Sequence, residues 1–173
     1  LSTPLKDSRL PKTRDTPAGV SHKTRGPYNN NPKHPRTQRQ KGVIAASAGN
    51  HAQGVALAAQ RLELDALIVM PKTTPDIKVR AVEQMGGEVI LHGNAYDDAY
   101  KHAMEIVAKR GMTFIHPYDD PDVIAGQGTV GMEILEQHAE QFLTKNKQPI
   151  HAIFVPVGGG GLIAGIAAYV KTL

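Results

Sequence analysis

The chain has 173 residues, 40% of them hydrophobic and 21% charged, and this composition predicts a packed domain of ordinary size. It contains no cysteine, which excludes a disulfide framework, a thiolate nucleophile and a cysteine-type zinc site, and which fits a cytoplasmic location. No apolar run approaches the roughly 20 residues that a membrane-spanning helix needs, so we predict no membrane partner.

Positive charge is concentrated in residues 1–41, although the net charge of the chain is only +4. This segment holds ten Lys or Arg residues against two acidic residues, and six of the twelve prolines. Few apolar groups are available there to offset the entropy of ordering the chain. We therefore predict a basic, Pro-rich leader, degenerate or disordered, over residues 1–41. A nucleic-acid-binding arm and a transit peptide are the alternatives.

From residue 42 onward, short apolar runs alternate with longer helical patterns. The runs predict strands at Val43–Ala46, Ala66–Met70, Glu88–Leu91, Thr113–Ile115 and Ile150–Val157. The patterns predict helices at about His51–Leu62, Pro75–Met85, Ala95–Lys109 and Leu162–Val170, and a broken helical region over Pro121–Phe142 that Gly126 and Gly128 interrupt. Strands that alternate with helices predict an α/β fold, with a parallel sheet and helices on both faces.

The loop after the first predicted strand carries polar groups at the carboxyl end of the sheet, where parallel sheets bind ligands. It reads Ser47-Ala48-Gly49-Asn50-His51-Ala52-Gln53-Gly54. Ser47 and Gly49 offer a hydroxyl and backbone donors that suit a carboxylate. Asn50 is alternatively a helix N-cap with Gln53 as its partner. His51 is a catalytic base, a metal ligand or a packing residue, and because the other histidines lack ligand spacing we predict no metal site.

Four consecutive glycines follow the last predicted strand and precede a helix. They are Gly158, Gly159, Gly160 and Gly161, with Leu162 next. Without side chains they leave the backbone N–H groups open to an anion, and a helix N-terminus adds to the attraction. A tight turn with close helix–sheet packing is the alternative. We favour a phosphate, so the two loops together predict a small phosphate-bearing ligand with a second anionic group nearby.

These stretches resemble threonine dehydratase, in the tryptophan-synthase-β-like group of pyridoxal-phosphate enzymes. Residues Val43–Ala56 resemble the family's substrate loop, and Phe154–Leu162 resemble its phosphate loop. Further matches are Ala66–Pro71, Gly86–Val89 and Ile124–Thr129. The resemblance implies a partial fold-type-II pyridoxal-phosphate enzyme, with residues 42–173 as its α/β cofactor-binding region. We expect that region to be incomplete at its C-terminal end and the chain to be truncated.

The resemblance also implies a reaction and a set of binding residues. The cofactor would be pyridoxal 5'-phosphate, with its phosphate on the tetraglycine loop and Leu162, and its ring hydroxyl on Asn50. Residues of the first loop would receive the amino-acid substrate: Ser47, Ala48, Gly49, Asn50 and His51. An ammonia-lyase of this kind converts L-threonine to 2-oxobutanoate and ammonia in isoleucine biosynthesis. A full-length family member would be a homo-oligomer with no nucleic-acid partner.

The candidate catalytic lysine is Lys23. Residues Ser21–Asn29 are similar to the family's Ser-Phe-Lys-x-Arg-Gly-Ala-Tyr-Asn stretch, whose lysine binds the cofactor covalently and moves the α-proton. Such a lysine needs desolvation to make its amine nucleophilic near neutral pH. His22 stands where the family has an aromatic residue, and Pro27 enters the expected helix, which Pro32 ends early.

Other functions stay open beside the dehydratase. A serine dehydratase or racemase shares the scaffold, and substrate choice is weakly determined by these residues. A non-catalytic ligand-binding or interaction fragment is favoured by family elements that are missing around Lys23 and after Leu173, and opposed by the intact loops. A nucleic-acid-binding protein that uses residues 1–41 is the last alternative, and it would bind in a salt-sensitive way.

Overall fold

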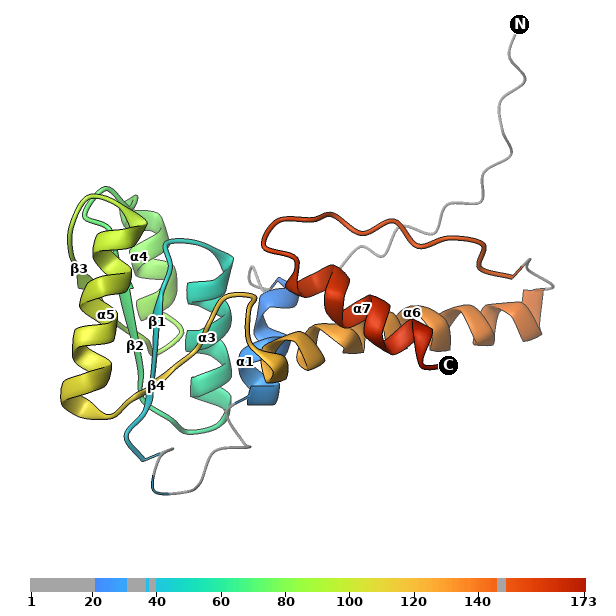
Figure 1. Cartoon of the computed structure of the whole chain (residues 1–173), viewed down its shortest axis with the longest axis horizontal. Helices are drawn as coiled ribbons and strands as arrows, with labels where there is room; N and C mark the ends of the chain where they lie inside the picture. Colours follow the sequence, from blue (N-terminus) through green and yellow to red (C-terminus); the bar gives the residue numbers. More distant parts are fainter. Residues whose placement is uncertain (1–20, 31–36, 38–39, 146–148) are drawn as a thin grey trace, which may run out of the picture.

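The computed structural model describes residues 21–30, 37, 40–145 and 149–173. The short 3-10 helix η1 and helix α1 come first, and a sheet region and two further helices follow (Figure 1). The elements are η1 His22–Thr24, α1 Arg25–Asn30, β1 Val43–Ala46, α3 Asn50–Arg61, β2 Ala66–Met70, α4 Asp76–Glu83, β3 Glu88–Leu91, α5 Tyr96–Arg110, β4 Thr113–Phe114, α6 Pro121–Lys145 and α7 Gly161–Lys171. The leader predicted over residues 1–41 lies largely outside the described residues.

The strands form one parallel sheet in the order β3-β2-β1-β4. Val43 of β1 pairs with Ala66 of β2 on one side and with Thr113 of β4 on the other. The chain therefore builds the sheet outward from β1 to β3 and then crosses back to place β4 on the opposite side of β1. The predicted α/β class and parallel sheet are confirmed.

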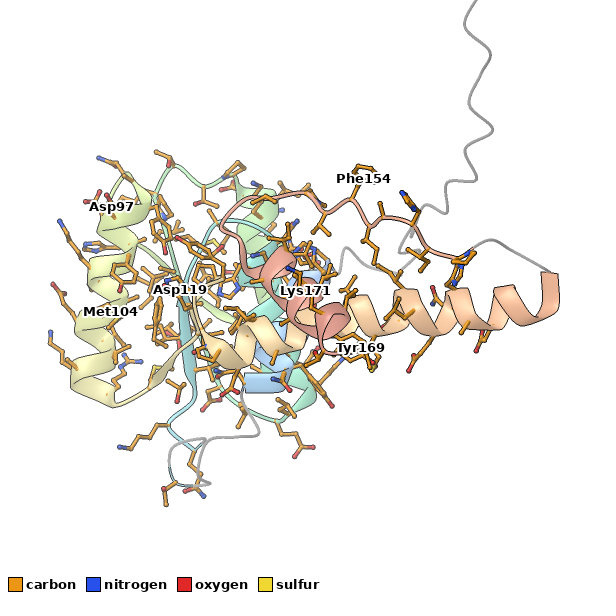
Figure 2. The ribbon with its side chains drawn as sticks, turned by 45° about the vertical axis from the view of Figure 1, so that its right-hand side comes forward. Asp97, Met104, Asp119, Phe154, Tyr169 and Lys171 are labelled. Carbon is orange, nitrogen blue, oxygen red and sulfur yellow. The ribbon has the colours of Figure 1, made fainter. Side chains whose placement is uncertain are left out.

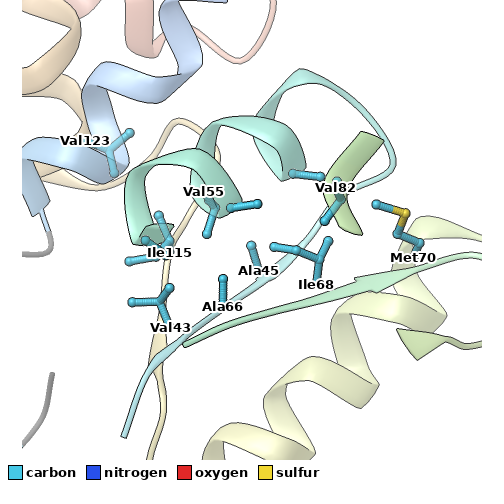
Figure 3. Packing of buried hydrophobic residues seen from close by; sticks show 12 residues of the cluster. Val43, Ala45, Val55, Ala66, Ile68, Met70, Val82, Ile115 and Val123 are labelled. Carbon is cyan, nitrogen blue, oxygen red and sulfur yellow. The ribbon is translucent and has the colours of Figure 1, made fainter. Parts of the chain in front are cut away.

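Two apolar clusters cover the two faces of the sheet. Helices α3 and α4 pack on one face around Ile68 and Val55, and α5 packs on the other face around Ile44 (Figure 3 shows the first cluster). Every residue of β1 and β2 is buried, which explains why these strands read as continuous apolar runs. Burying each large aliphatic side chain contributes roughly 1.5–3 kcal/mol, so these clusters fix the sheet edge that carries the site.

Helix α6 is continuous, which corrects the predicted break at its glycines. The glycines let two neighbouring backbones approach α6. A Cβ on Gly126 would collide with the carbonyl oxygen of Arg25 in α1, and a Cβ on Gly128 would lie 3.0 Å from the carbonyl oxygen of Gly165 in α7. Each glycine costs about 1 kcal/mol of helix propensity, which close packing against α1 and α7 offsets. The sequence pattern predicts a helix break at these two glycines, whereas in the structure they form the surface on which α6 packs against α1 and α7.

The predicted strand Ile150–Val157 is also wrong. Those residues run as an extended segment with no strand assignment, above α6 and α7 in Figure 1. Phe154 is 95% exposed and Val157 is 64% exposed. A strand needs a hydrogen-bonded neighbour as well as an apolar sequence, and the described residues provide no neighbouring strand at this place. The other predicted strands and helices are confirmed to within a few residues of their predicted ends.

Within the described part of the chain, no helix has the length and hydropathy to cross a membrane.

Candidate functional site

The sheet has a topological switch point between β1 and β4, because the strand order reverses there. Ligands of open parallel sheets bind beyond the carboxyl ends of the strands at such a point. The loop that follows β1 begins at Ser47, and the loop that follows β4 begins at Ile115. The candidate site is therefore formed by these two loops and by the segments that pack against them.

The loop after β1 is held to the sheet at its start and open at its tip. The Ser47 backbone N–H donates to the carbonyl oxygen of Val69 at 3.1 Å, and the Gly49 N–H donates to the Ser47 Oγ at 3.2 Å. Gly49 is the N-cap of α3 and Asn50 is its first residue, with no side-chain cap hydrogen bond. The alternative in which Asn50 caps the helix is therefore wrong. Its amide is exposed and free of that structural task.

His51 ties α3 to the loop after β4. Its Nε2 lies 2.9 Å from the carbonyl oxygen of Ile115, so this nitrogen carries the proton and donates it. The ring is buried, and Nδ1 has no hydrogen-bond partner among the described residues. Burial lowers the pKa of His51 from 6.5 to about 4, and the positive charge of Lys23 adds to the lowering. The imidazole is consequently neutral near pH 7, with an unprotonated Nδ1.

Lys23 reaches the same loop from the other side. Its Nζ donates to the carbonyl oxygen of Pro117 at 2.8 Å, two residues beyond the carbonyl that His51 binds. Burial lowers the pKa of the Lys23 amine from its usual 10.5, which makes the amine more nucleophilic near neutral pH. Its backbone packs closely on α3, where a Cβ on Gly54 would lie 2.7 Å from the Lys23 carbonyl oxygen.

Helix α1 and η1 are fixed by polar contacts with α6. The Arg25 guanidinium donates to the Thr129 hydroxyl at 2.6 Å and pairs with the Glu133 carboxylate at 2.5 Å. The Ser21 hydroxyl accepts from the Lys23 backbone N–H at 3.2 Å and caps η1. Such partly buried, charge-assisted contacts hold the segment that carries Lys23 in one place.

The tetraglycine loop meets the third side of the loop after β4. A Cβ on Gly161 would lie 2.7 Å from the Tyr118 carbonyl oxygen, and a Cβ on Gly159 would collide with the Tyr118 ring. Gly160 has φ +89, a left-handed conformation that favours glycine, and it is the N-cap of α7. Among the described residues, no atom beyond the chain neighbours lies within 4 Å of a Cβ position on Gly158 or Gly160, and Gly158 is exposed. A side chain at Gly159 or Gly161 would prevent this packing.

The loop His116–Asp120, with Ile115 before it, thus joins three groups that lie far apart in the sequence: Lys23, His51 and the tetraglycine loop. The sequence reasoning did not include this loop among the site residues. The sequence could have indicated this loop, because ligands bind beyond the carboxyl ends of parallel strands and the loop follows the predicted strand at 113–115. Among the other predicted site residues, Ser47 and Asn50 lie at the same sheet edge, and Leu162 lies half-buried in the first turn of α7.

Comparison with known proteins gives this arrangement a family. The model of a family described as pyridoxal-phosphate-dependent enzymes matches residues 10–173. The chain belongs to this family. It is 53% identical over 176 residues to the L-threonine dehydratase biosynthetic IlvA of Burkholderia multivorans, a match that covers 100% of this chain and 33% of the relative. It is 59% identical to the chloroplastic biosynthetic threonine dehydratase of Arabidopsis thaliana, over 92% of this chain and 26% of the relative.

Solved structures agree with the fold. The processed form of threonine deaminase isoform 2 from Solanum lycopersicum matches with a TM-score of 0.80 and 54% identity, over 88% of this chain and 40% of that one. Maize serine racemase matches with the same TM-score and 37% identity, over 88% of this chain and 44% of that one. The sequence-based resemblance and the partial fold-type-II assignment are confirmed. The chain spans about a third of the length of the Burkholderia multivorans relative and about a quarter of the length of the Arabidopsis thaliana relative.

Proposed function

We propose that this chain carries the cofactor- and substrate-binding part of a pyridoxal-phosphate-dependent threonine dehydratase, an ammonia-lyase that converts L-threonine to 2-oxobutanoate and ammonia. The observation that carries the proposal is the convergence of the Lys23 amine and the tetraglycine loop on residues Pro117 and Tyr118. An amine with a lowered pKa and a phosphate-binding turn at one sheet edge are the two attachments that pyridoxal phosphate needs.

The residues at this edge fit the cofactor. Gly158 and Gly160 have open space at their Cβ positions before the N-terminus of α7, where a phosphate would accept from backbone N–H groups. Asn50 has an exposed amide in the first turn of α3, available for the hydroxyl of the pyridine ring. When bound, pyridoxal phosphate supplies an electron sink for the charge that develops at the substrate α-carbon.

The chain's own side chains have separate tasks in this proposal. Lys23 holds the cofactor covalently and takes the proton from the substrate α-carbon, for which its desolvated amine is suited. Ser47 and the Gly49 backbone bind the substrate carboxylate, with Ala48 between them and Asn50 and His51 following in the first turn of α3. His51 is neutral near pH 7, so its ring brings no positive charge to the carboxylate site.

Threonine and serine differ by one methyl group, so substrate choice is the finer part of the proposal. The curated relatives at 53% and 59% identity are named threonine dehydratases, which favours threonine. A serine racemase or dehydratase is the second candidate, and it is favoured by the maize serine racemase structure. A cytoplasmic location stays a prediction, since a plant relative is named chloroplastic and a yeast relative mitochondrial.

A cofactor titration tests the proposal. Pyridoxal phosphate is added to wild type, Asn50→Ala, and Lys72→Ala as a control for an exposed lysine, and binding is followed by absorbance and by gel filtration. We expect Asn50→Ala to weaken cofactor binding about tenfold or more, while its unfolding free energy stays within about 0.5 kcal/mol of wild type, because Asn50 does not cap α3. Lys72→Ala should bind as wild type does. Unchanged binding in Asn50→Ala would contradict its assigned role.

The same titration separates the two substrate candidates. Threonine and serine are added in turn to the cofactor-loaded chain, and release of 2-oxo acid is followed together with the absorbance of the bound cofactor. The proposal expects threonine to perturb the absorbance at lower concentration than serine. A preference for serine would support the second candidate, and a response to neither amino acid would favour a non-catalytic ligand-binding fragment.

A further inference from the structure

A histidine ring nitrogen closes the turn after β4, over residues 116–119. The Nδ1 of His116 accepts the backbone N–H of Asp119 at 2.8 Å and that of Tyr118 at 3.4 Å. Because Nδ1 accepts, the ring carries its proton on Nε2. No backbone–backbone hydrogen bond closes this turn in the described part of the chain. Figure 2 shows Asp119, at the end of the turn, where the chain passes from the sheet region toward α6.

The ring that supplies this acceptor is held in place by other rings. His116 is half-buried and makes edge-to-face contacts with Phe114, at a centroid distance of 6.3 Å, and with Tyr118, at 4.9 Å. Phe114 belongs to β4, and its ring also contacts Tyr100 of α5 at 5.5 Å. The acceptor nitrogen is therefore fixed relative to the sheet.

The two residues inside the 116–119 turn make the contacts that join the site. The Pro117 carbonyl oxygen accepts from the Lys23 Nζ at 2.8 Å. The Tyr118 carbonyl oxygen would lie 2.7 Å from a Cβ on Gly161, so the tetraglycine loop packs directly on this residue. A change in the backbone of the turn therefore moves both contacts together.

The two ends of the loop are held by other groups. Before the turn, Ile115 donates its backbone N–H to β1 and accepts from His51 at its carbonyl oxygen. After the turn, the Asp120 carboxylate accepts two backbone N–H groups in the first turn of α6, each at 2.9 Å. Loss of the His116 acceptor should consequently loosen the middle of the loop and leave the sheet and α6 folded.

We propose that His116 is a positioning residue of the site. Its Nδ1 sets the 116–119 turn, and the turn holds the Lys23 amine and the tetraglycine loop at their shared contact. The contact with Pro117 also keeps the amine away from water, and burial is what lowers the pKa of Lys23 from 10.5. The importance of the turn for cofactor binding rests on the proposed function, whereas the role of His116 in the turn does not.

Amide exchange tests the role of His116 in the turn without cofactor. His116→Phe keeps an aromatic ring and removes the acceptor, whereas His116→Asn keeps an acceptor of the kind that commonly closes such turns. His102→Phe is the matched control, because His102 is half-buried on α5 and its Nδ1 contacts Glu105. We expect the Asp119 amide to exchange at least about tenfold faster in His116→Phe, and at close to the wild-type rate in His116→Asn and His102→Phe.

Equal exchange of the Asp119 amide in wild type and His116→Phe would overturn the proposal. Urea unfolding shows whether each variant is folded. Nitrogen NMR of the wild-type ring needs no variant and serves if His116→Phe does not fold. A His116 ring with a bare Nδ1 and a protonated Nε2 supports the proposal, and a proton on Nδ1 refutes it.

The hold on the Lys23 amine is measured by its reactivity with acetic anhydride, relative to that of the exposed Lys72. The pH dependence of this acetylation gives the pKa of the Lys23 amine. We expect that pKa to rise toward 10.5 in His116→Phe and to keep its wild-type value in His116→Asn and His102→Phe. An unchanged pKa of Lys23 in His116→Phe would refute the hold of the turn on the amine.

Labelling of Lys23 with pyridoxal phosphate and borohydride separates this proposal from the proposed function. We expect about a tenfold lower affinity for the label in His116→Phe, restored in His116→Asn. Equal labelling of Lys23 in wild type and His116→Phe would refute the positioning role and leave the proposed function standing. If amide exchange and the pKa of Lys23 respond as expected but wild type is not labelled at Lys23, His116 sets the turn and the proposed function fails.

Discussion

Acid should destabilise this chain through His51. The pKa of His51 is about 4 in the folded chain against 6.5 for an ordinary histidine, so below pH 6.5 the unfolded chain binds a proton that the folded chain refuses. The stability of the folded chain is therefore complete above pH 6.5, falls between pH 6.5 and 4, and levels off below 4. The whole difference corresponds to about 3 kcal/mol, and about 2 kcal/mol of it is lost between pH 7 and pH 5.

Urea unfolding at several pH values measures this contribution. His51→Gln retains an N–H donor for the carbonyl oxygen of Ile115 but does not titrate, and His151→Gln changes an exposed histidine as the matched control. Between pH 7 and 5, we expect wild type and His151→Gln to lose about 2 kcal/mol more than His51→Gln loses. Equal losses in all three proteins would refute the burial of a neutral His51 and its contact with the loop after β4.

Further predictions concern packing and polar contacts around Lys23. Gly54→Ala should cost about 1–3 kcal/mol of unfolding free energy, because its Cβ would meet the Lys23 carbonyl oxygen at 2.7 Å, whereas Gly49→Ala, in open space, should cost less than about 1 kcal/mol; denaturant midpoints compare them. Arg25→Met should cost about 2–4 kcal/mol of unfolding free energy, because it removes the partly buried ion pair with Glu133. Added salt should reduce this difference in unfolding free energy between variant and wild type less than it would for an exposed ion pair. Gln127→Met should leave thermal stability unchanged or raise it, because the buried Gln127 amide has no hydrogen-bond partner in the part of the chain that the structure describes; a loss above about 1 kcal/mol of unfolding free energy would contradict this.

Much of the sheet region could be predicted from the sequence, because its strands and helices are marked by local patterns of apolar residues. The residues of β1 and β2 are apolar throughout and end at turn signals, so period and length identify them. β1 and β2 also follow one another in the sequence and pair with each other in the sheet. For such elements a local pattern carries nearly the same information as the fold.

The failures occurred where distant contacts decide the structure. Gly126 and Gly128 read as helix breakers, yet contacts with α1 and α7 make them part of a continuous α6. The 150–157 segment has a strand sequence but no partner strand among the described residues. In both cases the structure that these residues adopt is decided by the backbone that lies next to them and not by their own sequence pattern.

The candidate site divides in the same way. The two glycine-containing loops are sequence motifs, and the resemblance assigned them directly. The contacts of Lys23 and His51 with Pro117 and Ile115 are carbonyl interactions, which leave no trace in the identity of the residues that accept them. Only the topology, with β4 beside β1, brings that loop to the site.

The most direct test of the proposed function is to locate the lysine that binds the cofactor. Pyridoxal phosphate is added near pH 7, the bond is reduced with borohydride, and the modified peptide is identified by mass. The proposal predicts about one label per chain at Lys23, lost in Lys23→Ala without new labels elsewhere. Labels scattered over exposed lysines such as Lys72 and Lys78, with Lys23 unmodified, would contradict it.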